Sequence, residues 1–392
     1  MTLTAVSLAT GVLTARFLGP EGRGEYFLGV TVLTLAAQVA TLGLHSSNTY
    51  LLSHRREALP ALVANSFWFA LAGGALSALA FGLLVAAGLV PVLGGAAAAV
   101  ALIGVVPALF TILGSGLLAG LGRFSTLNRC ELLARGLPLL AILGLTLVGR
   151  PGPLTFLAAV AAGFLAGAGA QVAALLASGG RLLPVERSLF RDALRYGLRV
   201  YMASALAFFV LRANVFILGR QRGAAEVGFL SVAAQIADVM TMVPASLALV
   251  LFPELVRSGR RWPTTRRTLF LAAALLAVMC LLAGLTAPLL LPLVFGRAFH
   301  PSVAVLLWSL PGVFFLGLVS VLSQYLAAVG FPWPLVGFWA GAAGLVLAAS
   351  TLLVPLFGAV GAAGALSATY AMLLLAVLRL ALRESRLEEP SV

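Results

Sequence analysis

Long apolar stretches separated by short polar joints run through the whole chain. Apolar runs of about 18 residues or more with few charges are typical of transmembrane helices. The alternating pattern of a membrane β-barrel is not found. Twelve runs can be delimited, at residues 1–18, 26–48, 61–87, 96–121, 130–149, 153–177, 194–218, 227–251, 268–292, 301–327, 334–355 and 360–382. The pattern therefore predicts an all-α polytopic membrane protein with about twelve transmembrane helices.

The longest polar stretch lies near the middle of the chain and leaves six apolar runs on either side. It predicts three parts: an N-terminal six-helix lobe at 1–180, a cytoplasmic amphipathic connector at 181–193, and a C-terminal six-helix lobe at 194–392. A lobe with an even number of spans returns the chain to the side on which it began. The two lobes are therefore expected to be parallel repeats about an axis normal to the membrane.

Similar short sequences at equivalent joints support this repeat. Leu18-Gly19 closes the first predicted span and Leu218-Gly219 closes the seventh. The segments 119–122 (AGLG) and 327–330 (AAVG) both follow the fourth span of their half. In folds built from such repeats, substrates bind near the midplane, at the interface of the repeats.

Composition and charge exclude several classes of protein. The chain is 61% hydrophobic and only 9% charged, whereas a soluble domain needs about a quarter charged residues. All 25 basic residues are arginine, and most lie on inward segments if the N-terminus is cytoplasmic. The positive-inside rule then predicts a multi-pass protein with both termini in the cytoplasm. The net charge of +13 reflects this topology, so no nucleic-acid partner is expected.

Several loosely specific joints occur in a consistent order. They are ARFLGPEGRGEY at 15–26, RYGLR at 195–199, AEVGFLSVA at 225–233, FP at 252–253, FGRAF at 295–299 and VPLFGAVGAA at 354–363. Together they resemble the polysaccharide-transport branch of the multidrug/oligosaccharidyl-lipid/polysaccharide exporter superfamily, which contains the flippases for lipid-linked oligosaccharide repeat units. The resemblance covers essentially the whole chain.

The resemblance implies two six-helix lobes around a central cavity that opens alternately to each side of the membrane. It implies an undecaprenyl-pyrophosphate-linked oligosaccharide as cargo and a location in the inner membrane of a bacterium. Membrane lipids, a polysaccharide polymerase and its assembly proteins are expected partners of a monomeric transporter. The family often has an acidic residue shortly after an arginine in the seventh span, but here the sequence is Arg212-Ala213-Asn214. The role of that acid therefore does not transfer to Asn214.

Two charged residues lie deep within predicted spans, where charge is costly and usually functional. Arg212 is six residues from the predicted outer end of its span, about 9 Å deep. Its guanidinium suits a pyrophosphate, or it extends to the outer headgroups. Asp238 lies eleven residues into the eighth span. It is a candidate coupling proton carrier, a resting partner of Arg212, or a neutral carboxyl hydrogen-bonded within its own lobe.

Other polar residues have alternative interpretations. Asn214 and Gln235, near Arg212 and Asp238 along the chain, are candidates for binding sugar hydroxyls, although such residues more often join helices. Arg16 either contributes positive potential at the cavity mouth or anchors the helix at the interface.

A basic stripe precedes the seventh span, with an arginine at every fourth position. If the segment is helical, these side chains share one face, which is typical of an amphipathic interfacial helix. It either captures an anionic headgroup at the cytoplasmic entrance or only fixes topology. The stripe consists of Arg187, Arg191, Arg195 and Arg199.

The leading functional hypothesis is a flippase for a polyprenyl-pyrophosphate-linked oligosaccharide. A multidrug exporter of organic cations is the main alternative, but it needs cavity carboxylates, and no acid is expected in the interior of the first six spans. A peptidoglycan-precursor flippase shares the preference for anions but usually has more spans. A membrane enzyme would need an acid/base constellation and a large external loop. No Walker motif, cofactor motif or metal cluster is found in the sequence, so a non-enzymatic transporter is expected.

Overall fold

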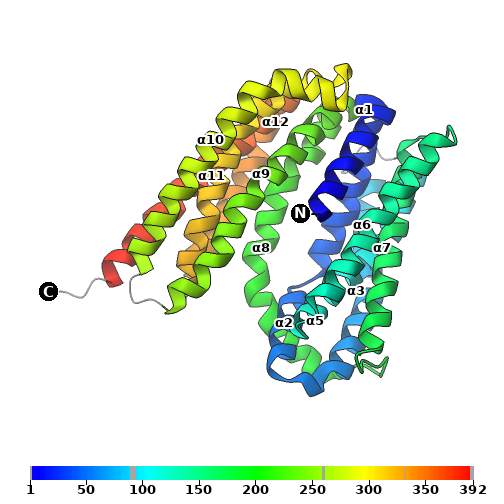
Figure 1. Cartoon of the computed structure of the whole chain (residues 1–392), viewed down its shortest axis with the longest axis vertical. Coiled ribbons are helices and arrows are strands. Elements are labelled where there is room, and N and C mark those ends of the chain that lie inside the picture. Colours follow the sequence, from blue (N-terminus) through cyan, green and yellow to red (C-terminus); the bar gives the residue numbers. More distant parts are fainter. Residues whose placement is uncertain (1, 89–93, 258–260, 331, 389–392) are drawn as a thin grey trace. The chain divides into compact units, whose positions relative to one another are not determined.

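The computed structural model describes residues 2–88, 94–257, 261–330 and 332–388 (Figure 1). Within these ranges the chain forms twelve α-helices and two short 3-10 turns, with no strand. The helices are α1 (Thr2–Ala40), α2 (Leu44–His54), α3 (Leu59–Ala86), α4 (Gly95–Ile103), α5 (Val105–Gly120), α6 (Phe124–Leu147), α7 (Pro153–Leu176), α8 (Arg187–Arg222), α9 (Ala224–Arg257), α10 (Arg261–Phe295), α11 (Ser302–Ala328) and α12 (Pro334–Glu388). The predicted all-α class is confirmed.

The helices account for the twelve predicted spans. In the described part of the chain, nine helical segments are long and apolar enough to cross a membrane. Two of these, α1 and α12, are each interrupted within their length and contain two spans, and the more polar α8 supplies the remaining one. The protein is therefore a multi-pass membrane protein.

Glycines make the two interruptions possible. Gly19 in α1 has φ 66° and ψ −176°, and Gly358 in α12 has φ 59° and ψ −134°. Both have the positive φ that glycine adopts without a steric penalty. Pro20 follows the first break directly, where a proline suits the first position of the next helix because its missing N–H would be unpaired there anyway.

The chain divides into two compact units, 1–208 and 209–392, so the division falls inside α8. In the first unit, α5 packs against α1, α2, α3, α6 and α7. In the second unit, α11 lies among α9, α10 and α12 (Figure 1). These central helices belong to the fourth span of each half, as expected for a repeat.

Small residues allow close helix packing in the first unit. A Cβ atom added at Gly163 of α7 would lie 2.4 Å from the carbonyl oxygen of Ala134 on α6, and one added at Gly167 would lie 2.6 Å from the Ala134 Cβ. Lipid tails are as apolar as leucine, so helices in a bilayer associate through such close contact rather than through the hydrophobic effect. The four-residue spacing places both glycines on the face of α7 that contacts α6.

The first part of α8 is amphipathic, as the sequence predicts. Arg187, Arg191 and Arg195 are exposed, whereas Ala193 and Gly197 are buried on the opposite side. The helix begins at Arg187 and continues without a break into the seventh span. The side chain of Arg199, the fourth residue of the stripe, lies outside the described part of the structure.

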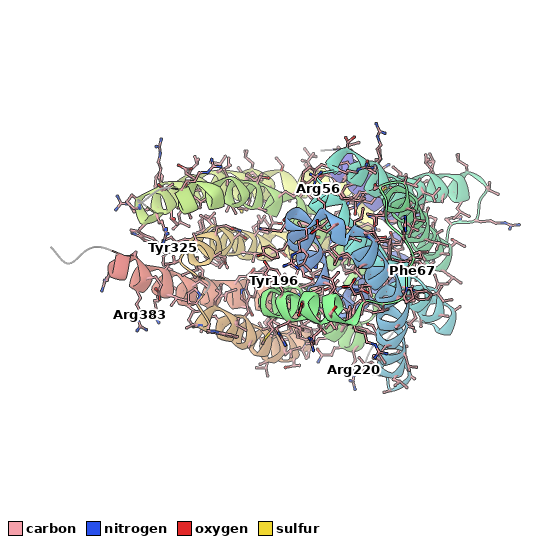
Figure 2. The ribbon with its side chains drawn as sticks, turned by 90° about the horizontal axis from the view of Figure 1, so that it is seen from below. Arg56, Phe67, Tyr196, Arg220, Tyr325 and Arg383 are labelled. Atoms are coloured by element: carbon pink, nitrogen blue, oxygen red, sulfur yellow. The ribbon has the colours of Figure 1, made fainter. Side chains whose placement is uncertain are left out.

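This part of α8 packs on the joint between α1 and α2. The Tyr201 hydroxyl donates to the Val39 carbonyl at 2.6 Å, one of the carbonyls left without a helical partner at the end of α1. Gly197 meets Gly43, which has φ 75°; a Cβ at Gly43 would lie 2.2 Å from the Gly197 oxygen. Tyr196, labelled in Figure 2, stacks on a tyrosine of α2 with ring centroids 4.6 Å apart.

Candidate functional site

A cavity of about 90 Å³ lies within the second unit, among α8, α9, α11 and α12. Most of the residues that line it are apolar, and a few polar side chains converge on it, as in typical ligand-binding pockets. The lining residues are Leu211, Arg212, Asn214, Val215, Leu230, Ala234, Ala237, Asp238, Thr241, Ser309, Gly312, Val313, Leu316, Ala363, Leu366, Ser367 and Tyr370.

The two intramembrane charges singled out in the sequence form an ion pair in this cavity. The Arg212 Nη2 atom lies 3.1 Å from Asp238 Oδ2. Of the two side chains, that of Arg212 is 18% exposed and that of Asp238 is 46% exposed. The pair neutralises both charges inside a membrane span, where an isolated charge is costly. This geometry is the one expected if Asp238 is the resting partner of Arg212.

Arg212 lies farther from the end of its helix than the sequence predicted. The predicted span ended at residue 218, but α8 continues to Arg222. Arg212 is therefore ten residues from the helix end, about 15 Å along the axis rather than 9 Å. The extra turn carries two arginines and a glutamine, whose polarity hides the helix in a hydropathy pattern. In the structure the Arg212 guanidinium contacts Asp238.

Asn214 and Tyr370 complete the polar lining beside the pair. The Asn214 Nδ2 atom donates to the Ala362 carbonyl of α12 at 3.3 Å, and its Oδ1 atom is buried and has no partner among the described residues. Tyr370 is 3% exposed and is close enough to interact electrostatically with both Arg212 and Asp238. Sequence reasoning missed Tyr370 because nothing distinguishes it there from other aromatic residues within spans.

Other predicted site residues are not part of this cavity. Gln235 is half-buried on α9, one turn before Asp238, but does not line the cavity. Arg16 is exposed in the first unit, three residues before the break at Gly19. The exposed arginines at the start of α8 also belong to the first unit.

The first unit contains an acid that the sequence analysis placed only at the very end of a span, the one predicted at 130–149. Glu131 lies in α6, which begins at Phe124 rather than at residue 130. Its Oε1 atom accepts a hydrogen bond from Ser115 of α5 at 3.2 Å, and its Oε2 atom lies 3.4 Å from Arg135 one turn later. The expectation that the first six spans have no interior acid was therefore wrong. It failed because the polar first two turns of α6 were assigned to a loop.

Arg23 is a second charged residue of the first unit that sequence reasoning placed at a helix end. It is only 4% exposed, it donates to the Thr14 hydroxyl, and its guanidinium carbon lies 5.5 Å from the centroid of the Tyr26 ring. The break at Gly19 brings it back against the preceding part of α1. A break of this kind does not change the hydropathy pattern. Its only sign in the sequence is the Gly-Pro dipeptide.

Residues at the turn between α8 and α9 form hydrogen bonds with the backbone of α12 on both sides of its break. Arg222 donates to the carbonyls of Val354 and Pro355, which lie before the break. The Glu226 carboxylate accepts from the Ala359 N–H at 2.7 Å, just after the break. A basic side chain thus meets the carbonyl end of one helical segment and an acidic one meets the amide end of the next, matching both helix dipoles.

Comparison with protein-family models identifies the family of this chain. A family model described as polysaccharide biosynthesis protein matches residues 1–259, about two thirds of the chain. No curated protein sequence matches.

Solved structures resemble the fold. An inward-facing multidrug resistance MATE family transporter of the MOP superfamily is 15% identical with a TM-score of 0.79, and the alignment covers 100% of this chain and 96% of that one. The lipid II flippase MurJ, in an inward closed conformation, is 14% identical with a TM-score of 0.78, covering 96% and 85%. A MOP superfamily transporter from Pyrococcus furiosus is 15% identical with a TM-score of 0.65, covering 99% and 92%.

Proposed function

Because the chain belongs to the polysaccharide biosynthesis protein family and has the fold of MOP superfamily transporters, we propose that it is a flippase for a polyprenyl-pyrophosphate-linked oligosaccharide. The cargo crosses the membrane by alternating access, with its pyrophosphate at the Arg212 side of the cavity in the second unit and its polyprenyl tail in the bilayer. The solved structures that share the fold include a multidrug transporter and a flippase, and the proposal is accordingly a transporter rather than an enzyme.

The observation that carries this proposal is the guanidinium of Arg212 in the cavity lining. It lies about 15 Å from the end of α8 and is held by Asp238 at 3.1 Å. A guanidinium presents its N–H donors in a planar fork, which matches a pyrophosphate in bidentate geometry. Asp238 is then a resting anion that the substrate anion replaces, and the arginine charge stays neutralised throughout the exchange.

Further assignments belong to the same proposal. The protein resides in the inner membrane of a bacterium as a monomer with both termini in the cytoplasm. Arg16 contributes positive potential along the substrate path, and Gln235 contacts sugar hydroxyls on that path. The arginine stripe of α8 contacts anionic headgroups on the cytoplasmic side. A polysaccharide polymerase and its assembly proteins receive the cargo.

Gene deletion in the native host tests the function. We expect undecaprenyl-linked oligosaccharide to accumulate on the cytoplasmic face, and the wild-type gene to clear it. The Arg212→Ala variant should fail to clear it, whereas Arg220→Ala, which changes an exposed arginine on the same helix, should succeed. Deletion without accumulation of any lipid-linked oligosaccharide would refute the proposal.

Exchanging the charges of Arg212 and Asp238 distinguishes substrate binding by Arg212 from simple ion pairing with Asp238. The double variant Arg212→Asp/Asp238→Arg restores an ion pair but moves the cation to α9. If Arg212 only balances Asp238, the exchanged pair should clear the accumulated lipid. If Arg212 binds the substrate anion, the exchanged variant should remain inactive although it is present in the membrane at the wild-type level.

Export of organic cations is the second candidate, because Asp238 is the more exposed member of the pair and the fold is shared with a multidrug transporter. Under this function, deletion sensitises the host to cationic drugs without accumulation of lipid-linked sugar. The Asp238→Asn variant would then lose drug resistance. It also tests coupling, since unchanged activity and unchanged pH dependence in this variant would exclude Asp238 as a proton carrier.

A further inference from the structure

Arg135 is a charged residue in the middle of a helix of the first unit that is long and apolar enough to cross a membrane. It lies about 17 Å along α6 from either end of that helix, and its side chain is 51% exposed. Charge within a bilayer is costly, so it normally faces a partner or a water-filled cavity rather than lipid. The exposed surface around Arg135 is therefore unlike a lipid-facing surface.

The exposed leucines of α6 mark the side of the helix that faces lipid. They are Leu133, Leu137 and Leu140. At about 100° per residue, these leucines lie about 140–160° around the helix from Arg135. Ala134 packs against glycines of α7 on a further side, and Arg135 itself contacts Ser7 of the neighbouring helix α1 (Figure 1). Of the exposed sides of α6, the one with Arg135 is thus the one suited to a water-filled path.

The contacts of Arg135 are few and long. Its Nε atom lies 3.4 Å from Glu131 Oε2, and its Nη1 atom lies 3.4 Å from the Ser7 hydroxyl oxygen. Both distances exceed the roughly 2.7–3.2 Å of a well-formed N–H···O bond. The Nη2 atom contacts no acceptor among the described residues. The edge of the guanidinium formed by Nη1 and Nη2 therefore still has N–H donors to offer.

Glu131 is held in place by residues other than Arg135. Its Oε1 atom accepts a hydrogen bond from Ser115 of α5 at 3.2 Å, and Gln171 of α7 donates to the same serine hydroxyl at 3.2 Å. The carboxylate thus keeps its own support when Arg135 binds another anion. It orients the guanidinium through Nε and competes with a second anion for its charge.

A guanidinium with one open edge matches two phosphate oxygens in bidentate geometry. The contact with Glu131 places the charged group of Arg135 about 10 Å along the axis from the start of α6. We propose that Arg135 binds the pyrophosphate of the lipid-linked cargo, in the half of the substrate path nearer to the start of α6. The proposal rests on the flippase function, in which that half is cytoplasmic and Arg135 forms a loading site used before Arg212.

Equilibrium binding of radiolabelled geranyl pyrophosphate to the full-length protein in phosphatidylcholine nanodiscs tests the site. An Arg212→Ala parent removes the site proposed in the second unit. In this parent, Arg135→Gln should weaken binding roughly tenfold, as expected for lost hydrogen bonds to a charged group. Glu131→Gln should tighten binding about threefold, because it removes a competing carboxylate from a partly exposed pair. Arg129→Gln removes an exposed arginine of the same helix and should leave the affinity unchanged.

Further measurements separate cargo binding from folding and from contact with ordinary lipid. Arg135→Lys keeps the charge beside Glu131 but lacks the planar fork, so it should bind several-fold more weakly than the parent even if Arg135→Gln does not fold. The ratio of affinities between the parent and Arg135→Gln should be the same in nanodiscs that contain phosphatidylglycerol. A ratio that falls to one there shows that a lipid headgroup occupies Arg135 and overturns the proposal. Equal affinities of the parent, the glutamine variant and the lysine variant overturn it as well.

The loading site and the flippase function fail in different ways. If gene deletion accumulates no lipid-linked oligosaccharide, the function is refuted even where Arg135 binds geranyl pyrophosphate. If the deletion accumulates this lipid and Arg135→Gln clears it as fast as the wild type, the role of Arg135 is refuted and the flippase function stands.

Discussion

Replacing Glu226 by alanine should loosen the start of the second segment of α12. The carboxylate accepts the Ala359 N–H at 2.7 Å, and a Cβ added at the neighbouring Gly358 would lie 2.7 Å from the same carboxylate oxygen. No other side chain in the described structure caps this amide. The variant therefore removes both a charged hydrogen bond and a negative charge from a helix N-terminus.

The size of the effect follows from these two contributions. A hydrogen bond to a charged group contributes about 1.5–3 kcal/mol, and a charge at a helix end about 0.3–1 kcal/mol. We expect Glu226→Ala to destabilise the local structure by about 2 kcal/mol, which corresponds to a roughly thirtyfold increase in amide exchange when exchange occurs by local opening. Glu226→Gln keeps an acceptor and should raise exchange only about threefold, the part due to charge.

Hydrogen–deuterium exchange of purified protein in nanodiscs, read on peptides covering residues 354–364, measures this opening. Glu254→Ala changes an exposed acid at the other end of α9 and should leave these peptides at the wild-type rate. If Glu226→Ala changes their exchange by less than twofold, the carboxylate does not hold the break. If the glutamine and alanine variants behave alike, the hydrogen bond contributes nothing beyond the charge.

The joint between α1 and α2 provides two further predictions. Tyr201→Phe removes the donor to the Val39 carbonyl and should lower the free energy of unfolding in mixed micelles by about 1 kcal/mol; an unchanged midpoint would contradict this. Gly197→Ala places a Cβ 2.9 Å from the backbone of Gly43 and should sharply reduce the yield of monodisperse protein in size-exclusion chromatography. Gly169→Ala, where the added Cβ meets nothing within 4 Å, should not.

Hydropathy predicted the spans because the bilayer imposes a length and an apolar composition on each of them. It misplaced helix ends wherever the first or last turns are polar. The last turn of α8 was assigned to a loop for this reason, as were residues 124–129 of α6, which put Glu131 at the end of its predicted span. The distance of Arg212 from the end of its helix was underestimated as a direct result.

The site was predictable only in part. The pairing of Arg212 with Asp238 followed as one alternative from their similar depth on consecutive spans, because intramembrane charges need partners. Tyr370 and the contact between Glu226 and Ala359 were not predictable. They join α12 to α8 and α9 across more than 130 residues of sequence, and no local pattern encodes which helix faces meet.

The continuity of α8 has a consequence for dividing the protein. A cut in the segment before Arg187 would separate residues 187–208 from the first unit, on which they pack. A cut at the boundary of the units, after Phe208, would leave about four amides and four carbonyls without partners inside the bilayer, each costing several kcal/mol. Co-expressed half-transporters should therefore assemble poorly at either cut. The two lobes repeat one architecture, but they have to be made as one continuous polypeptide.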